Sequence, residues 1–328
     1  MVPTLTAGAK LAECLWSLQR QTLRDFELVV VDNSGRGIVR AGPSLPDCIV
    51  LEQDRNLGFG AAVNEGFRRS RAPFLATLND DAVAAPGWLQ ALTQAIEASP
   101  DTGMCASRVI LAGGRGLDSA GMVLCGDGSS KQRGHRWPPA KFDSPGEVLF
   151  PSGSAAMYRR RMLEEIGLFD KDFFLYCEDT DLGLRARWAG WRCLYVPEAV
   201  VEHHYSESAG RASPLKAYYV ERNRIYVAVK NFPAGMLARA PWVALRRYFW
   251  HAVSIARGRG AAAEFRREGN HPLRLAAYVA RAHLAAAASM RRLWRQRREI
   301  RRRARLTSGE FQALAAAHAI SPRQVAEL

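Results

Sequence analysis

The sequence has no uninterrupted run of 18 apolar residues and no basic-then-apolar segment at its N-terminus. A helix needs about 20 apolar residues to cross a bilayer, so neither a membrane-spanning helix nor a secretory signal peptide is expected. The six cysteines are scattered and form no CxxC pair, which excludes zinc-finger spacing. A chain of 328 residues can bury an adequate core without a disulfide framework. We therefore expect reduced thiols and a cytoplasmic protein.

The last third of the chain, residues 231–328, contains neither lysine nor aspartate. It carries 19 arginines against 5 glutamates, whereas basic and acidic residues balance in residues 1–230. The net charge of +14 therefore belongs entirely to this last third. The overall content of 48% hydrophobic and 24% charged residues is that of a globular protein and excludes wholesale disorder.

Short apolar segments alternate with helical patterns in the first half of the chain. Residues 26–31, 48–51 and 74–78 have the apolar composition of buried strands, and residues 11–18 and 61–69 have helical spacing. This alternation predicts an α/β fold with an open, mostly parallel sheet flanked by helices. Ligands of such sheets bind beyond the carboxyl ends of the strands, so the polar turns that follow the strands should line one cleft.

Asn79-Asp80-Asp81 follows the third of these strands. Two adjacent carboxylates on a turn can present oxygen ligands to Mg²⁺ or Mn²⁺, together with the phosphates of a substrate. The alternative is a helix cap, which is the commoner use of aspartate at such a position.

A second acidic group comprises Glu178, Asp179 and Asp181. Three acids in four residues repel one another and raise their pKa values, which suits a general base or a metal ligand. Acids in the first turn of a helix also complement its dipole. That alternative accounts for one or two acids but poorly for three, so we expect one catalytic and one capping acid.

His203 and His204 follow a strand that is expected to end at Pro197. Imidazole is a common metal ligand, although a histidine pair in a loop can equally be structural or solvated. Asp32, after residues 26–31, could accept hydrogen bonds from a nucleotide, or could be a plain turn residue. Residues 55–60 contain glycines but lack the spacing of a GxGxxG or GxxxxGK motif, so dinucleotide and P-loop sites are poorly supported.

Taken in this order, these segments resemble the family 2 glycosyltransferases, especially the bacterial rhamnosyltransferase-like branch. The matching segments are residues 2–4, 17–22, 29–34, 56–64, 78–81 (Leu78-Asn79-Asp80-Asp81), 153–156, 167–170, 176–182 (with Glu178-Asp179-Thr180-Asp181), 197–203 and 222–224. The resemblance covers about residues 2–232, and the joint pattern is specific although no single piece is.

The resemblance implies a GT-A nucleotide-diphospho-sugar transferase fold and an inverting, metal-dependent transfer with Mg²⁺ or Mn²⁺. It implies a base at Asp179 or, failing that, Glu178, and metal ligands at Asp81 and His203. The nucleotide-sugar-binding residues that it implies are Thr4, Asp32, Asn56, Asn64, Asn79, Asp80 and Gly153. The expected reaction moves rhamnose from dTDP-rhamnose to a hydroxyl of a cell-surface polysaccharide or lipid-linked glycan.

Two alternatives stay open at this point. The same fold could use a UDP- or GDP-sugar as donor, or the chain could be a non-catalytic GT-A scaffold. The joint presence of Asp80, Asp81, Asp179 and His203 argues against the scaffold. The family's first strand is longer than Val2-Pro3-Thr4, so this strand is expected to be truncated, and Thr6 stands where the family usually has asparagine.

The predicted domains are a catalytic domain over residues 1–232 and a helical, basic extension over residues 233–328. Residues 237–260 and 272–306 of the extension combine apolar residues with dense arginine. We expect these helices to lie on anionic lipid at the inner face of the cytoplasmic membrane. The alternatives are a solvated or oligomerising helical face and, less expected, nucleic-acid binding, for which no recognition motif is present.

Overall fold

In a computed structural model of the protein, the described residues are 1–42, 46–114, 116–204, 213–258 and 272–328. The chain divides into two compact units: the first unit is residues 1–122 with 132–205, and the second unit is residues 123–131 with 206–328. The domain boundary predicted at residue 232 stays a prediction. Residues 259 and 260 of the predicted arginine-rich helices, and residues 259–271 of the predicted extension, lie outside the described part.

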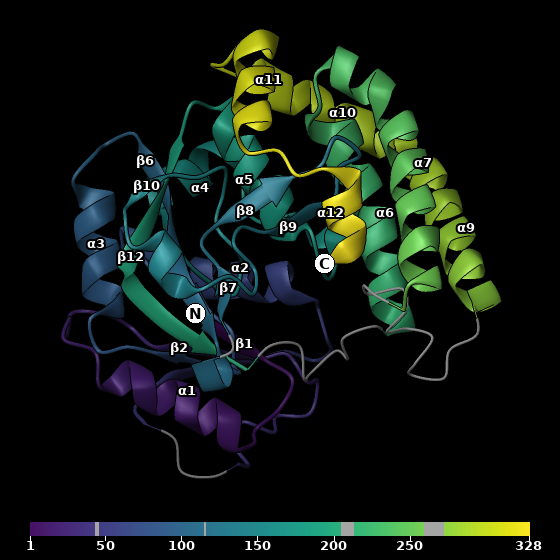
Figure 1. Cartoon of the computed structure of the whole chain (residues 1–328). Helices are drawn as coiled ribbons and strands as arrows, with labels where there is room; N and C mark the ends of the chain where they lie inside the picture. Colours follow the sequence, from purple (N-terminus) through teal and green to yellow (C-terminus); the bar gives the residue numbers. More distant parts are fainter. Residues whose placement is uncertain (43–45, 115, 205–212, 259–271) are drawn as a thin grey trace. The chain divides into compact units, whose positions relative to one another are not determined.

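The first unit begins with a parallel three-stranded sheet in the order β1-β2-β3 (Figure 1). The strands are β1 (Val2–Thr4), β2 (Val29–Asp32) and β3 (Ile49–Glu52), and the helices that follow them are α1 (Ala9–Gln19) and α2 (Phe59–Arg69). All four residues of β2 are buried, as its unbroken apolar run predicts. Thr4 pairs with Asp32, so the carboxyl ends of β1 and β2 lie side by side.

A larger sheet of seven strands completes the first unit, with the path β10-β12-β6-β11-β4, and with β5 paired to β12 and β7 paired to β6. Its strands are β4 (Phe74–Leu78), β5 (Ala82–Ala84), β6 (Thr102–Leu111), β7 (Leu117–Ser119), β10 (Gly146–Glu147), β11 (Ala155–Arg159) and β12 (Arg192–His203). Only β6 and β12 pair in parallel in this sheet, because β11 runs opposite to both β4 and β6. The α/β class is confirmed, but the sheet is mixed rather than mostly parallel.

Helices cover this sheet and fix its strand ends. They are α3 (Trp88–Glu97), α4 (Arg160–Ile166) and α5 (Glu178–Trp188), with single 3-10 turns at η1 (Ala112–Gly114), η2 (Pro139–Phe142) and η3 (Lys171–Phe173). Leu92 and Ile96 of α3 are fully buried in a core cluster that also contains Leu78 of β4 and Val201 of β12. Helical spacing of apolar residues on α3 thus builds the layer on which the site-bearing strands rest.

The strand that precedes His203 corrects one expectation. Pro197 was predicted to end it, but β12 continues through the proline to His203. The pairing with β6 shifts between Val196, opposite Ser107, and Val200, opposite Arg108. Proline is tolerated in strands at such a bulge because no ladder hydrogen bond is required there. His203 is therefore the last residue of a strand, not part of a loop.

The second unit is mainly helical. Its helices are α6 (Pro214–Asn231), α7 (Ala234–Ala256), α9 (Pro272–Ala288), α10 (Met290–Arg302), α11 (Ser308–Ala317) and α12 (Pro322–Glu327), and the short strands β8 (Met122–Leu124) and β9 (Ser130–Gln132) pair with each other. α6 packs on α9 and α10, and α7 packs on α12 (Figure 1). Among the helices of the described ranges, none is long and apolar enough to cross a bilayer.

Candidate active site

The ends of β1, β2 and β4 meet in the first unit. Thr4 Oγ1 lies 2.5 Å from Asp80 Oδ2, and the backbone N–H of Asn33 donates to the carbonyl of Thr4 at 2.8 Å. Asp32 lies beside Thr4 in the strand register. The structure thus brings together three residues that the sequence predicted for this cleft, Thr4, Asp32 and Asp80.

The N-terminus of α5 is attached to the same strand ends. The backbone N–H of Asn79 donates to the carbonyl of Ser154 at 2.8 Å, and the neighbouring N–H of Gly153 donates to Asp179 Oδ2 at 3.0 Å. Gly153 also accepts a hydrogen bond from Thr77 of β4. Asp179 is therefore held against the end of β4, two hydrogen bonds away from the acidic turn.

His203 lies between two aspartates. Its Nε2 is 3.1 Å from Asp81 Oδ1 and its Nδ1 is 2.8 Å from Asp118 Oδ2, and all three side chains are buried. Asn79 Nδ2 is 3.4 Å from the same Nε2. Burial lowers the pKa of His203, but the hydrogen bonds to Asp118 and Asp81 outweigh burial and raise this pKa to about 9.

The pKa values of the two acids of the turn, Asp80 and Asp81, are shifted in opposite directions. Burial raises the pKa of Asp80, with repulsion from Asp81 adding to it and the Thr4 hydroxyl opposing it. Burial also raises the pKa of Asp81, but the hydrogen bond with His203 and the charge of that imidazole together outweigh burial and lower this pKa below its ordinary value. Asp81, whose Oδ1 faces an imidazole nitrogen, is thus the acid of the pair whose charged form is favoured.

Glu178 and Asp179 form the second acidic pair. Burial raises both pKa values, and repulsion from Asp179 raises that of Glu178 further, to about 8. Asp179 accepts hydrogen bonds from Gly153 and from the N–H of Thr180 at 2.6 Å, whereas Glu178 Oε2 is buried without a hydrogen-bond partner. Asp179 is consequently the oriented carboxylate of the two, and a raised pKa suits a general base.

Asp181, the remaining acid of this segment, has a structural role. It is fully buried and accepts from Arg185 Nε at 2.9 Å. The other two guanidinium nitrogens of Arg185 donate to the carbonyls of Ile166, Gly167 and Leu168. Of the three acids that were predicted to divide catalytic and capping roles, Asp181 therefore has a structural role.

The backbone before Glu178 is strained. Phe174, Tyr176 and Cys177 have φ values of 63°, 67° and 66°, a left-handed conformation that costs non-glycine residues about 1–3 kcal/mol each. Gly58, with φ 83°, makes room for this segment, because a Cβ there would lie 2.0 Å from the carbonyl oxygen of Phe174. Strain of this kind concentrates at functional sites.

Two predicted nucleotide contacts hold loops in the structure. Asp32 accepts from the N–H groups of Ser34 at 3.0 Å and Val39 at 2.9 Å. Asn56 Oδ1 accepts from the N–H of Gly58 at 2.8 Å and from Asn33 Nδ2 at 3.1 Å. Both side chains hold the backbone of the loops that follow β2 and β3, and their contact with a nucleotide stays a prediction.

Asn64 lies apart from this network. Its side chain makes two hydrogen bonds with the backbone of Phe169, at 2.8 and 3.1 Å, and so fastens α2 to the segment after α4. Its predicted nucleotide contact also stays a prediction. His204, the second histidine of its pair, points elsewhere and lies 3.9 Å from Glu13.

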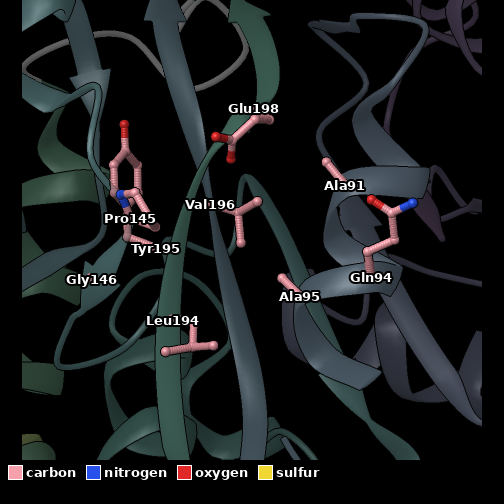
Figure 2. Close-up of a pocket in the computed structure, with 9 residues that line it drawn as sticks. All are labelled: Ala91, Gln94, Ala95, Pro145, Gly146, Leu194, Tyr195, Val196 and Glu198. Atoms are coloured by element: carbon pink, nitrogen blue, oxygen red, sulfur yellow. The ribbon is translucent and has the colours of Figure 1, made fainter. Parts of the chain in front are cut away.

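A groove in the first unit lies away from all the predicted site residues. It has a volume of about 350 Å³ and is lined by residues of α3, β10 and β12 and their flanks (Figure 2). Figure 2 shows Gln94 and Ala95 on one side and Tyr195 on the other, with Glu198 as its only labelled acid. It contains no pair of acids and no histidine, so it does not change the location of the candidate site.

Sequence reasoning missed Asp118 and the role of Asn33. Asp118 lies on β7, inside a Gly- and Ser-rich stretch whose composition is typical of a loop. β6, the strand with which β7 pairs, was not predicted from the sequence. The sequence signal is a single acid between Leu117 and Ser119. Asn33 accepts from the N–H of Leu57 and so joins the turn after β2 to the turn before α2.

Comparison with known proteins gives the family. The family model "Glycosyl transferase family 2" matches residues 1–167, and "Glycosyl transferase family group 2" matches residues 139–290. An N-acetylglucosaminyl-diphospho-decaprenol L-rhamnosyltransferase of Mycobacterium tuberculosis (strain ATCC 25618 / H37Rv) is 30% identical over 290 residues, which are 78% of this chain and 93% of that protein. The uncharacterized glycosyltransferase YwdF of Bacillus subtilis (strain 168) is 28% identical over 62% of this chain and 72% of its own length.

One solved structure bears on the fold. The crystal structure of GalNAc-T7 with UDP, GalNAc and Mn²⁺ superposes with a TM-score of 0.59 at 16% identity, over 75% of this chain. The chain spans about half of that structure, 49% of its length. The family-model match, the 30% identical relative and this superposition show that the chain is a member of glycosyl transferase family 2, a glycosyltransferase with a GT-A fold.

Proposed function

We propose that the protein is an inverting, metal-dependent glycosyltransferase that uses Asp179 as its base. The observation that carries this proposal is the hydrogen-bonded connection from Asp179 through Gly153 and Ser154 to Asn79, at the start of the acidic turn. The pKa values of the two acids also support it: that of Asp179 is raised, and that of Asp81, in the acidic turn, is lowered. Such a division suits a reaction in which one group takes a proton and another holds a charged leaving group.

In the proposed reaction, Asp179 accepts the proton of an acceptor hydroxyl while that oxygen bonds to the anomeric carbon. The bond from this carbon to the nucleoside diphosphate breaks on the opposite face, which inverts the configuration. Gly153 and Thr180 hold the carboxylate of Asp179 in one orientation through their backbone N–H groups. A positioned base of this kind contributes about 10²–10⁴-fold to the rate.

Asp81 and His203 fit the binding of a divalent cation. A carboxylate oxygen and an imidazole nitrogen converge at 3.1 Å, and Mn²⁺ or Mg²⁺ is commonly held by one or two protein groups together with substrate phosphates. Within the described ranges no group of three or more His, Cys, Asp or Glu side chains is arranged as a complete metal site. Asp81 and His203 would therefore share the cation with the donor diphosphate, and the cation would stabilise the charge of the leaving group.

For the donor and acceptor, we propose dTDP-rhamnose and a lipid-linked glycan hydroxyl, as a step in building a cell-surface polysaccharide. The support is the rhamnosyltransferase of Mycobacterium tuberculosis, whose name includes a diphospho-decaprenol acceptor and which matches this chain over 93% of its own length. A UDP- or GDP-sugar donor is the alternative, because selectivity for the sugar depends on loop contacts that strand positions do not determine.

Turnover of a panel of dTDP-, UDP- and GDP-sugars tests the proposal, with Mn²⁺ or Mg²⁺ and with chelator, on the wild type and on Asp179→Asn. We expect one donor to turn over only with metal, and the rate to fall at least 100-fold in the variant, in line with the loss of a general base. Turnover that persists in chelator would contradict the metal, and full activity of Asp179→Asn would contradict the base.

We also propose that the second unit lies on an anionic lipid surface at the cytoplasmic face of the membrane. α7 exposes three large apolar side chains, Trp242, Leu245 and Phe249, at 71%, 55% and 61% exposure. Their spacing puts them on one face of the helix, and exposed arginines, Arg239 and Arg246, flank it. α10 exposes a row of arginines: Arg291, Arg295, Arg298 and Arg302.

Apolar side chains beside arginines are the pattern of a helix that lies in a membrane interface, where each basic residue adds about 1 kcal/mol on anionic lipid. Co-sedimentation of the full chain with phosphatidylglycerol and with phosphatidylcholine vesicles tests this role. We expect binding to the anionic vesicles that weakens as salt is raised. Equal partitioning into both kinds of vesicle would contradict the proposal and favour a solvated or oligomerising face.

A further inference from the structure

Asp118 lies behind His203, on the side away from Asp81. It is the middle residue of β7, which pairs with β6, and β6 also pairs with β12, the strand that ends in His203. Asp118 is only 2% exposed, and its Oδ2 lies 2.8 Å from Nδ1 of His203. The two partners are 85 positions apart in the sequence and are brought together because their strands both pair with β6.

The other oxygen of Asp118 faces a second histidine. Oδ1 lies 3.2 Å from Nδ1 of His135, whose side chain is also largely buried, and the hydrogen bond of this Nδ1 is with the backbone carbonyl of Asp118, also at 3.2 Å. Burial raises the pKa of Asp118, and the rings of His135 and His203 lower it further than burial raises it. Carboxylates are costly to bury without a partner, and the hydrogen bond between Oδ2 and His203 Nδ1 supplies this partner and fixes the two side chains relative to each other.

An imidazole can present only one of its nitrogens as a lone pair, and the hydrogen bond at the other nitrogen decides which. A carboxylate at Nδ1 keeps the proton there, fixes the angle of the ring, and makes Nε2 the better ligand. In this protein Nε2 is the nitrogen that faces Asp81.

We propose that Asp118 is a positioning residue that orients His203 so that Nε2 and Asp81 can share a divalent cation. This inference rests on the proposed function, because it takes Asp81 and His203 as the ligands. Asp118 itself touches neither the cation nor the donor; it acts through the ring of His203. Outer carboxylates of this kind typically change metal affinity 10- to 100-fold when they are removed.

Mn²⁺ titration of the full chain, followed by electron paramagnetic resonance in the presence of a mixture of dTDP, UDP and GDP, tests the proposal. The variants are Asp118→Ala, Asp118→Asn and His203→Ala, with His135→Gln as the matched control, because His135 contacts the opposite oxygen of Asp118. We expect the Mn²⁺ dissociation constant to rise 10- to 100-fold in Asp118→Ala and less in Asp118→Asn, which keeps an acceptor oxygen. We expect His135→Gln to stay within threefold of the wild type.

The kinetics of the same variants separate positioning from general damage. In Asp118→Asn the Mn²⁺ concentration for half-maximal turnover should rise, while kcat at saturating Mn²⁺ recovers to within a fewfold of the wild type. A merely structural defect would lower kcat at every Mn²⁺ concentration. Asp118→Asn carries the test if circular dichroism shows that Asp118→Ala is unfolded, because it is close to isosteric.

The outcomes distinguish the two proposals. Normal Mn²⁺ affinity in both Asp118 variants, with weak affinity in His203→Ala, would overturn the role of Asp118 and leave the metal site standing. Normal affinity in His203→Ala would overturn both. An equal loss in the Asp118 variants and in His135→Gln would mean that any change in this cluster disturbs the site, and would likewise overturn a specific positioning role.

Discussion

Both units bury charged side chains, but they treat them differently. In the second unit, Glu221 and Asp127 lie against Arg224 and Arg247, and these guanidinium groups lower both carboxyl pKa values against the effect of burial. In the first unit, burial raises the pKa values of Glu178, Asp179 and Asp80, and repulsion from the neighbouring acid raises those of Glu178 and Asp80 further. Compensated charges stabilise a helical packing, whereas uncompensated ones mark the place where chemistry is expected.

The largest effect should come from breaking the compensated cluster. Glu221→Gln leaves two buried guanidinium groups, Arg224 and Arg247, with Asp127 as the remaining carboxylate, and removing one member of a buried ion pair typically costs about 3–5 kcal/mol. Urea unfolding measures this loss. Glu327→Gln, which removes an exposed carboxylate that pairs with Arg323 at 2.8 Å, is the matched control and should cost less than about 1 kcal/mol.

If the two units differ as described, donor turnover per folded Glu221→Gln molecule should equal that of the wild type. A fall in kcat at a temperature where the variant is fully folded would show that the cluster also serves the active site, and would break the comparison.

Replacing a glycine with alanine should change stability in opposite directions in the two units. Gly58→Ala puts a Cβ 2.0 Å from the carbonyl of Phe174 and forces a φ of 83° on alanine, so we expect a loss of about 1–3 kcal/mol and a lower kcat. Gly235→Ala, within α7, meets no atom within 4 Å and should gain up to about 1 kcal/mol through helix propensity.

Thermal unfolding of the two alanine variants measures the loss and the gain of stability, and donor turnover measures the change in kcat. Equal stability of Gly58→Ala and the wild type would mean that the segment from Phe174 to Cys177 can move aside, and that its left-handed backbone is not held by Gly58.

The pH dependence of stability sharpens the description of the acidic pair. The pKa of Glu178 rises from an ordinary value of 4.5 to about 8, because burial and the charge of Asp179 favour its neutral form. The folded state therefore keeps a proton that the unfolded state releases between these values, so stability falls as pH rises through this window. The free energy of unfolding of Glu178→Gln should therefore increase relative to that of the wild type as pH rises from 4.5 to 8. Above pH 8 the difference between the two proteins should stay constant.

Urea midpoints of the wild type and Glu178→Gln at half-unit pH steps measure this difference. A difference that does not change with pH would show that Glu178 ionises at its ordinary pKa, and would remove the electrostatic contrast between the two units.

The smallest effect on stability should come from the exposed face of α7. Trp242→Ser with Phe249→Ser removes side chains that are 71% and 61% exposed, and such surface changes usually alter stability by less than about 0.5 kcal/mol each. Binding to phosphatidylglycerol vesicles should nevertheless fall. A large drop in the unfolding midpoint would mean that this face packs against protein rather than lipid.

Much of the first unit could be predicted from the sequence because the patterns that indicate its strands and helices lie within short segments. β4 spans the predicted residues 74–78, and Asn79-Asp80-Asp81 directly follow its end. Asp181 was grouped with Glu178 and Asp179 because a run of acids does not show which one meets Arg185. That pairing depends on one turn of helix and on three carbonyls from another segment.

What the sequence did not predict depends on pairing between distant strands. β12 continues past Pro197 because it pairs with β6 on both sides of the bulge. Asp118 lies close to His203 because β7, which carries Asp118, also pairs with β6. Proline and glycine are reliable signs of a break only where no neighbouring strand supports the backbone. Tertiary support therefore explains both the wrong end of β12 and the missed aspartate.

The bulge in β12 makes the length of one segment matter more than its chemistry. Val196 pairs with Ser107 and Val200 with the next residue, Arg108, so three residues of β12 are looped out. Side chains alternate between the two faces of a sheet, and an odd number of extra residues exchanges the faces beyond that point. Pro197, Glu198 and Ala199 thus act as a spacer that sets which way His203 points. Glu198 is the exposed residue of the three, so substitution should be tolerated there, while deletion of a single residue would turn the imidazole away from Asp81.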